Sequence, residues 1–321
     1  MRTDLRRAFV GSGKERKMGF VDSRGDMVVA PQFSGGFDFS EGVGVVVNAA
    51  SGRMAVIDGS GREVFPAKYP RLFPRADGRH RYSPGLGIGF LDQRGEALPI
   101  KLTEDAKDFS ENVASLRQFG ESHVSIIDAT GRIFARSHAP NLVIATEGVV
   151  PFCDGASELF GFLDLIGNVV VEPQFEFARS FSQGFAAVVM GDNRRRRAGF
   201  IDHGAKFLPI SGATGCEPYT DGLAVFSAMV GRNQLCGAVN LRQEIVIPPA
   251  FALIGRFVEK LAPARLPKGK WGFVDSGGTW RIPPEFDDAE PFKFGLAEVT
   301  VKRERFYINY RGEIMWRETL E

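Results

Sequence analysis

Short apolar segments that end in a glycine–aromatic–aliphatic–aspartate signature recur along the whole chain. The clear copies are Gly19–Asp22, Gly89–Asp92, Gly161–Asp164, Gly199–Asp202 and Gly272–Asp275. Weaker copies begin at positions 55, 125, 237 and about 306, so each copy starts 34 to 38 residues after the one before. A nearly constant spacing of this length is typical of tandem repeat proteins. The pattern therefore predicts an array of about nine units with a period of ~36 residues.

Each repeat contains three predicted strands, of which the signature forms the first. That strand ends at an aspartate or asparagine, and glycine follows three residues later, as in Asp275 and Gly278. Aspartate caps the backbone of a tight turn and glycine accepts a positive φ, so a second strand should fold back on the first. A proline is expected to end this second strand, because proline cannot donate to a strand ladder. These prolines are Pro31, Pro173, Pro248 and Pro283.

The third predicted strand follows a block such as Phe39–Gly42 and has no polar side chain over Val43–Val47. A strand that is apolar on both alternations is buried on both faces, so each small sheet should lie between its neighbours. The third strand of one copy, joined to the first two of the next, makes a three-stranded antiparallel meander. We therefore predict an all-β fold of about nine meanders with propeller-like or superhelical stacking, a closed ring remaining an alternative.

The repeats run from residue 18 to the end, which predicts one array over residues 1–321 rather than two separate cores. The regular units cover residues 18–47, 88–116, 160–189, 198–226, 236–264 and 271–301. The degenerate units cover residues 54–82, 124–150 and 306–317.

The best-preserved repeat resembles the WG-repeat family, also called KWG repeats. The resemblance is carried by Lys270–Asp275, which reads KWGFVD, and by Ile282–Ala289, which reads IPPEFDDA. Most other copies replace the family's tryptophan, with Met18, Met54, Ile88, Val124, Phe160, Ala198 or Cys236. The family is largely bacterial, shares no enzymatic activity and is generally taken to mediate binding. The resemblance therefore implies a class of behaviour rather than a particular ligand.

Charge and composition narrow the functional classes. The 321 residues carry 40 basic and 39 acidic side chains, a net charge of +1, which provides no field for nucleic acid or a membrane surface. No segment has the roughly 18 apolar residues of a spanning helix, and Met1–Lys17 has no apolar run typical of a secretory signal. Three cysteines without paired spacing fit a reducing compartment, so we expect a cytoplasmic protein.

The side chains that could carry chemistry form no catalytic or metal-binding motif. Each repeat turn supplies a single aspartate, whereas a hard-cation site needs several converging oxygens, so turn capping is the expected role. The histidines and cysteines occupy unrelated phases of the repeat, without zinc-ligand spacing. We therefore expect no catalytic residue, cofactor or metal, although a nucleophile and base could still meet in space. These residues are His80, His123, His138, His203, Cys153, Cys216 and Cys236.

Residues that break the repeat are the candidates for recognition. The sharpest feature is a run of four arginines where a hairpin turn enters a first strand: Arg194, Arg195, Arg196 and Arg197. It could contact an acidic partner surface or phosphate, or it could be a solvated turn whose side chains snorkel. Three irregular stretches, Tyr69–Pro84, His138–Glu147 and Ser211–Glu217, are the predicted recognition loops.

The sequence favours a non-enzymatic scaffold that binds another protein. A long array, near-neutral charge and the absence of a catalytic motif support this interpretation, and an immunity-type or secretion-associated partner is one form of it. The alternative is a carbohydrate- or cell-envelope-binding repeat protein, which the aromatic content suggests but which would require export.

Overall fold

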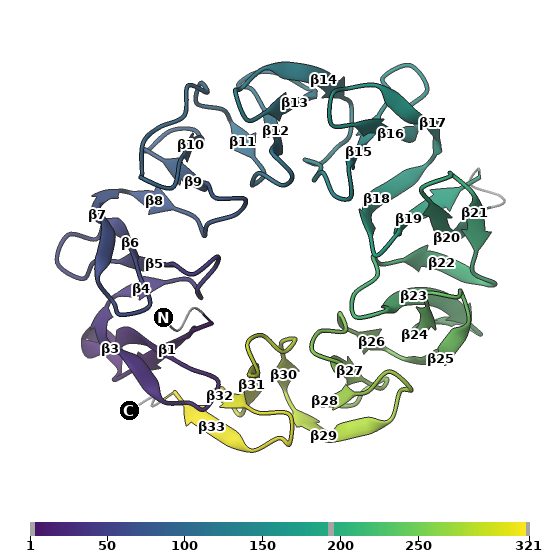
Figure 1. Ribbon diagram of the computed structural model, residues 1–321. Coiled ribbons are helices and arrows are strands. Elements are labelled where there is room, and N and C mark those ends of the chain that lie inside the picture. The colour runs from purple at the N-terminus through teal and green to yellow at the C-terminus, as the bar shows by residue number, and fades with distance from the viewer. Residues whose placement is uncertain (1–3, 192–195, 319–321) are drawn as a thin grey trace. The chain divides into compact units, whose positions relative to one another are not determined.

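The computed structural model describes residues 4–191 and 196–318, and its regular structure is almost wholly β (Figure 1). The exception is a single 3-10 turn, η1 (Gly13–Glu15). No helix in these two ranges is long and apolar enough to cross a bilayer. By internal contacts the chain divides into two compact units, residues 1–144 with 316–321 and residues 145–315. The predicted all-β fold is confirmed.

The first unit contains four antiparallel sheets, numbered here sheets 1 to 4 in chain order. Sheet 1 is β1 (Arg6–Val10), β2 (Lys17–Val21) and β3 (Met27–Phe33); sheet 2 is β4 (Gly35–Gly36), β5 (Gly44–Val47), β6 (Met54–Ile57) and β7 (Glu63–Tyr69); sheet 3 is β8 (Arg71–Leu72), β9 (His80–Ser83) and β10 (Gly89–Leu91); sheet 4 is β11 (Asp105–Ala106), β12 (Val113–Arg117), β13 (Val124–Asp128) and β14 (Ile133–Ser137).

The chain then forms five further sheets of the same kind, sheets 5 to 9. Sheet 5 is β15 (Val149–Cys153), β16 (Phe160–Asp164) and β17 (Val169–Phe175); sheet 6 is β18 (Phe177–Ser182), β19 (Phe185–Met190), β20 (Arg197–Asp202) and β21 (Phe207–Pro209); sheet 7 is β22 (Ala213–Cys216), β23 (Leu223–Val230), β24 (Asn233–Asn240) and β25 (Ile245–Phe251); sheet 8 is β26 (Leu253–Ile254), β27 (Ala262–Arg265), β28 (Trp271–Val274) and β29 (Trp280–Phe286); sheet 9 is β30 (Asp288–Ala289), β31 (Ala297–Val301), β32 (Glu304–Ile308) and β33 (Ile314–Arg317).

Most sheets have one strand more than predicted. Six of the nine described sheets have four strands, and in these the extra first strand lies just before the left-handed turn. In sheet 9 it is Asp288–Ala289, which pairs with Thr300 and Val299. Four of the six extra strands have only two residues, and strands this short leave no alternating pattern in the sequence. The other three strands follow the predicted antiparallel order.

The repeat proline does not end its strand, which corrects the prediction. Strand β3 continues through Pro31 to Phe33, and β17, β25 and β29 likewise contain their prolines. These strands are the last of their sheets, so one side of each is unpaired and tolerates the missing N–H. The pairing with the preceding strand shifts register beside the proline, from Met18↔Phe33 to Phe20↔Val29.

The close approach of the last two strands explains the glycine of the signature. A β-carbon on Gly161 would lie 2.4 Å from the carbonyl oxygen of Val171 on the neighbouring strand. The same clash, at 2.3 to 2.6 Å, would occur at Gly19, Gly199, Gly237 and Gly272. Only glycine lets the two backbones approach so closely without movement of the strand.

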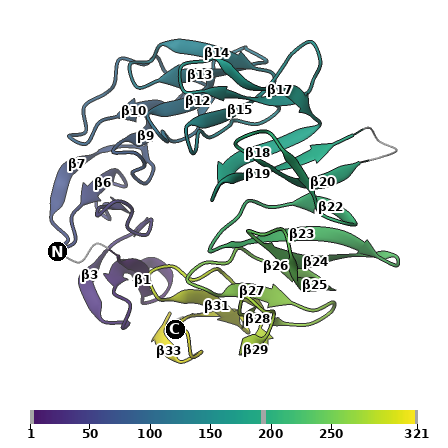
Figure 2. The ribbon, with the colours of Figure 1, turned by 45° about the vertical axis from the view of Figure 1, so that its right-hand side comes forward.

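Within each unit, successive sheets stack face to face, as the blades of a β-propeller do. One core lies between sheets 8 and 9, where Phe273 and Phe286 of sheet 8 meet Phe292, Val299 and Phe306 of sheet 9. Figure 2 shows sheets 7 and 8 of the second unit side by side. The third strand of each repeat is the second strand of its sheet, and we predicted that it is buried on both faces. This is confirmed in β5, where Gly44, Val45 and Val46 are all buried.

Candidate functional site

The antiparallel order gives every four-stranded sheet two distinct ends. The turn between its first two strands and the turn between its last two lie at one end, which we call the turn end. The loop between the second and third strands lies at the opposite end, the loop end. In sheet 8 the turn end holds residues 259–260 and 275–278, and the loop end holds residues 266–270.

The repeat aspartates hold the turns between the last two strands. Asp58 Oδ1 accepts hydrogen bonds from the backbone amides of Ser60 (2.9 Å) and Arg62 (3.2 Å), while Gly61 has a φ of +87°. Asp128 does the same in sheet 4, and the Thr130 hydroxyl hydrogen-bonded to it lowers the pKa of its carboxyl to about 2. The predicted turn-capping role is confirmed. Within residues 4–191 and 196–318, no three His, Cys, Asp or Glu side chains gather as metal ligands would.

A second turn at the turn end is a two-residue hairpin with both residues in the left-handed region. Glu41 and Gly42 have φ values of +47° and +78°, and Ser40 and Val43 exchange two backbone hydrogen bonds around them. Two consecutive left-handed residues suit the right-handed twist of paired strands. The equivalent pairs are at 77–78, 111–112, 147–148, 183–184, 221–222, 259–260 and 294–295.

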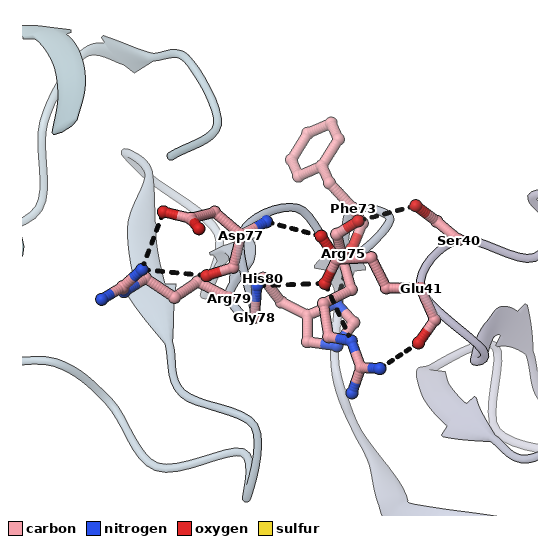
Figure 3. Close-up of polar contacts among 8 residues, drawn as sticks. All are labelled: Ser40, Glu41, Phe73, Arg75, Asp77, Gly78, Arg79 and His80. Carbon is pink, nitrogen blue, oxygen red and sulfur yellow. Dashed lines mark hydrogen bonds and ion pairs between the residues drawn. The ribbon is translucent and has the colours of Figure 1, made fainter. Parts of the chain in front are cut away.

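The first side chain of this hairpin reaches the same hairpin in the next sheet. Glu41 Oε1 accepts from the Asp77 amide (2.7 Å) and Oε2 from the Gly78 amide (3.0 Å), as Figure 3 shows. Further links of this kind join neighbouring sheets within each of the two compact units. The others are Asp77 to Asn112 (2.7 Å), Glu147 to Gly184 (3.0 Å), Gln183 to Gly222 (2.8 Å), Asp221 to Lys260 (2.8 Å) and Glu259 to Gly295 (3.1 Å).

The predicted recognition loop Tyr69–Pro84 contributes its arginines to the same links. Arg75 Nε lies 3.3 Å from Glu41 Oε2, and Ser40 Oγ donates to the Arg75 carbonyl (2.7 Å; Figure 3). Arg79 Nη1 bonds the Asp77 carboxylate at 3.1 Å. Most of both arginine side chains is buried. Arg75 therefore joins sheets 2 and 3, and Arg79, whose Nη2 donates to Asn112 Oδ1 (3.1 Å), joins sheets 3 and 4. Both cations are largely withdrawn from solvent.

Two further residues of this loop also bond to groups within the fold. Arg81 forms a forked pair with Asp108, through Nε at 2.5 Å and Nη2 at 3.1 Å. His80 is buried, its Nδ1 lies 2.9 Å from the Phe73 carbonyl oxygen, and burial lowers its pKa. A histidine whose pKa lies below its usual range stays neutral near pH 7.

The other two predicted recognition loops also pack on neighbouring strands. In the stretch 138–147, the Val143 carbonyl accepts from Ser115 Oγ (2.6 Å) and the Pro140 carbonyl from Arg117 (3.0 Å). Ser211–Glu217 contains β22, whose pairing with β23 shifts register around Thr214. A cavity of about 160 Å³ lies there between sheets 6 and 7, lined in part by Cys216.

The arginine run lies only partly within the described residues. Arg196 forms an ion pair with Glu176 at 2.5 Å, and the Arg197 guanidinium lies over the Phe207 ring at 5.4 Å. Both arginines are exposed at the loop end of sheet 6. Arg194 and Arg195 lie outside the described residues. The predicted contact of this run with a partner stays a prediction.

An exposed apolar patch at the loop end of sheets 3 and 4 was not predicted. Leu86, Leu102 and Phe119 are 78%, 39% and 51% exposed. A β-carbon on Gly87 would lie 3.2 Å from both Leu102 Cβ and Phe119 Cζ, so these side chains meet around that glycine. Leu86, next to it in the chain, completes what we call the Leu86 patch. The sequence feature that could have indicated this patch is a leucine inside the glycine-rich loop 83–89.

Comparison with known proteins supports the repeat assignment. The family described as "WG containing repeat" matches residues 18–48, 160–193, 237–271 and 271–302. No curated protein matches the chain.

Several solved structures are similar to the chain at low identity. The chain is similar to apo AztD from Citrobacter koseri, with 13% identity, a TM-score of 0.46, and coverage of 100% of this chain and 96% of that one. Hsv2p of Kluyveromyces lactis has 13% identity, a TM-score of 0.39, and coverage of 64% and 74%. Oligopeptidase B from Leishmania major has 9% identity, a TM-score of 0.45, and coverage of 99% and 49%. These scores are too low to carry a functional argument.

Proposed function

Because the chain belongs to the family of WG-repeat proteins, we propose that it is a non-enzymatic scaffold that binds another protein. The observation that carries this proposal is the Leu86 patch. In the regular repeats the aromatic side chains at the repeated position, such as Phe175 and Phe286, are buried in the cores between sheets. The patch instead presents large apolar side chains to solvent where the repeat is broken.

The composition of the Leu86 patch is that of a protein contact. Burying one leucine or phenylalanine side chain contributes roughly 1.5–3 kcal/mol, so three exposed ones at this end of the sheets can anchor an interface. Phe119 is an aromatic anchor at its edge, and exposed Lys101 and Glu104 flank Leu102 along the chain. An apolar centre with a charged rim is the usual anatomy of such interfaces.

The state of the reactive side chains supports a role without catalysis. Burial raises the pKa of the Cys216 thiol to about 12, and it also raises the pKa of Cys153. A catalytic cysteine needs the opposite shift, toward thiolate.

We also propose where the protein resides and which class of partner it binds. We place the protein in the cytoplasm, in keeping with three cysteines that have no paired spacing in the sequence. We propose an immunity-type or secretion-associated partner, and we keep the arginine run around Arg196 as a second contact for an acidic surface of it. A toxin or secretion gene beside the coding gene supports this form, and polysaccharide genes contradict it.

The test begins by recovering partners of the tagged protein from its native cell. The recovered partner is purified and titrated against wild type, Leu86→Ser and Phe119→Ser. Ile166→Ser is the matched control, because Ile166 is 68% exposed but lies in a regular turn of sheet 5. We expect both patch variants to weaken binding at least about tenfold and the control to bind normally.

Two outcomes contradict the proposal. Unchanged affinity of both patch variants would remove the Leu86 patch as the contact. Glycan binding without any stoichiometric protein partner would favour the carbohydrate alternative.

A further inference from the structure

The second unit has an open hollow at the turn end of sheets 8 and 9. Its volume is about 650 Å³, within the range of small-ligand and peptide side-chain sites. The hairpin of sheet 8 provides one side and the last turn of sheet 9 the other. The lining residues are Glu259, Lys260, Leu261, Arg281, Tyr310 and Arg311.

Tyr310 forms a fixed aromatic surface in this hollow. Its ring stacks on Phe292, with centroids 4.9 Å apart and planes inclined by 29°, and 47% of the residue remains exposed. Its hydroxyl donates to Glu259 Oε2 at 2.9 Å, and the same oxygen accepts from the Gly295 amide at 3.1 Å. The ring is therefore held before any ligand arrives, which lowers the entropic cost of binding.

The same arrangement of a stacked ring and a glutamate, without the cations, occurs between sheets 5 and 6. There His203 stacks on Phe181 at 4.2 Å and contacts Glu147 at 3.0 Å, in the repeat positions of Tyr310, Phe292 and Glu259. The stacked ring and the acid are thus part of the repeat. What is particular to the hollow is its charge, because the positions equivalent to Lys260, Arg281 and Arg311 hold Gly148, Val170 and Gly204.

The cations of the hollow are available to a ligand. Lys260 and Arg311 are exposed, and neither side-chain cation has an ion-pair or hydrogen-bond partner within the described parts of the chain. Arg281 uses Nε to bond Asp275 Oδ2 at 2.9 Å and is 63% exposed in its side chain. Arginine recognises carboxylates through a planar fork, and tyrosine and arginine are among the residues most enriched at binding hot spots.

We propose that this hollow binds an acidic peptide segment. An apolar side chain of the segment packs on the exposed face of Tyr310, while an adjacent carboxylate pairs with Arg311 and Lys260. The alternation of an apolar floor and a cationic rim selects a segment in which aspartate or glutamate neighbours an apolar residue. This site is separate in sequence from the Leu86 patch, and it stands whether or not that patch binds a partner.

The test measures the fluorescence anisotropy of a short labelled peptide of alternating glutamate and leucine. The same peptide with lysine in place of glutamate tests the sign of the charge. Arg311→Glu is the site variant, and Arg242→Glu is its matched control, since Arg242 is an exposed arginine at the same turn position of sheet 7. Tyr310→Ala removes the ring, and circular dichroism of each variant verifies the fold.

We expect saturable binding of the acidic peptide that Arg311→Glu and Tyr310→Ala weaken at least about tenfold and that Arg242→Glu leaves unchanged. Equal weakening by Arg311→Glu and Arg242→Glu would overturn the proposal, because binding would then follow net charge. Absent binding, or preference for the lysine peptide, would overturn it too. Tighter binding of a uronate oligosaccharide through Arg311 would replace the peptide by an acidic sugar.

Discussion

Glu41 Oε1 accepts a 2.7 Å hydrogen bond from the backbone amide of Asp77, 36 residues further along the chain. The spacing equals one repeat, so the bond joins equivalent hairpins of neighbouring sheets. Because each unit repeats the link with Asp77, Glu147, Asp221 or Glu259 as the acid, the sheets are connected by polar bonds at their turn ends as well as by apolar cores.

Removal of the Glu41 carboxylate should destabilise the fold. Glu41→Ala leaves two backbone amides without their acceptor and Arg75 without its ion-pair partner, and we expect a loss of about 1–3 kcal/mol in the free energy of unfolding. Glu41→Gln should lose less, because Gln183 fills the same role in sheet 6. Urea denaturation measures both, with the exposed Glu63→Ala as control. A Glu41→Ala variant as stable as the control would show that the link contributes nothing.

Replacement of a signature glycine, even by alanine, should destabilise the fold. In Gly161→Ala the new methyl group would lie 2.4 Å from the Val171 carbonyl oxygen, so the last strand must move, and we expect a loss of about 1–3 kcal/mol. Gly215→Ala is the control, because no atom lies within 4 Å of its β-carbon position. Thermal unfolding of the two variants compares them. Equal melting temperatures would contradict the close-approach explanation.

The turn at Asp128 should give stability that depends on pH. The Thr130 hydroxyl donates to Asp128 Oδ1 at 2.6 Å and lowers the carboxyl pKa from 3.8 to about 2. A lowered folded-state pKa stabilises the protein above about pH 4, and this contribution disappears as the pH falls through about 2. Thr130→Val should raise the Asp128 pKa, measured by carboxyl-carbon NMR titration. A pKa still near 2 in the variant would assign the shift to other groups.

The thiol of Cys216 should react slowly in the folded protein. Burial raises its pKa to about 12, so at pH 8 the thiolate fraction is about three orders of magnitude below that of a free cysteine. Alkylation with iodoacetamide, followed by mass spectrometry at Cys216, should therefore proceed far more slowly than in urea. Labelling at the unfolded rate under native conditions would contradict a buried, protonated thiol.

The sequence by itself determined the repeat and its turns. The interval between Gly161 and Gly199 predicts one sheet per copy, and the Asp58 cap was predictable because its bonds to Ser60 and Arg62 stay within four residues. The apolar run of β5 likewise predicted burial on both faces, which the structure confirms. Such features depend on residues close in the chain, so their pattern is visible without coordinates.

Tertiary structure alone decided where the binding surfaces lie. Leu102 and Phe119 come together at Gly87 from separate loops, and Tyr310 meets Glu259 across 51 residues, so their spacing in the chain gives no signal. The two-residue first strands and the edge position of Pro31 also follow from pairing with strands outside the local segment. Binding surfaces arise where side chains from different repeats converge, and convergence depends on how sheets stack rather than on local pattern.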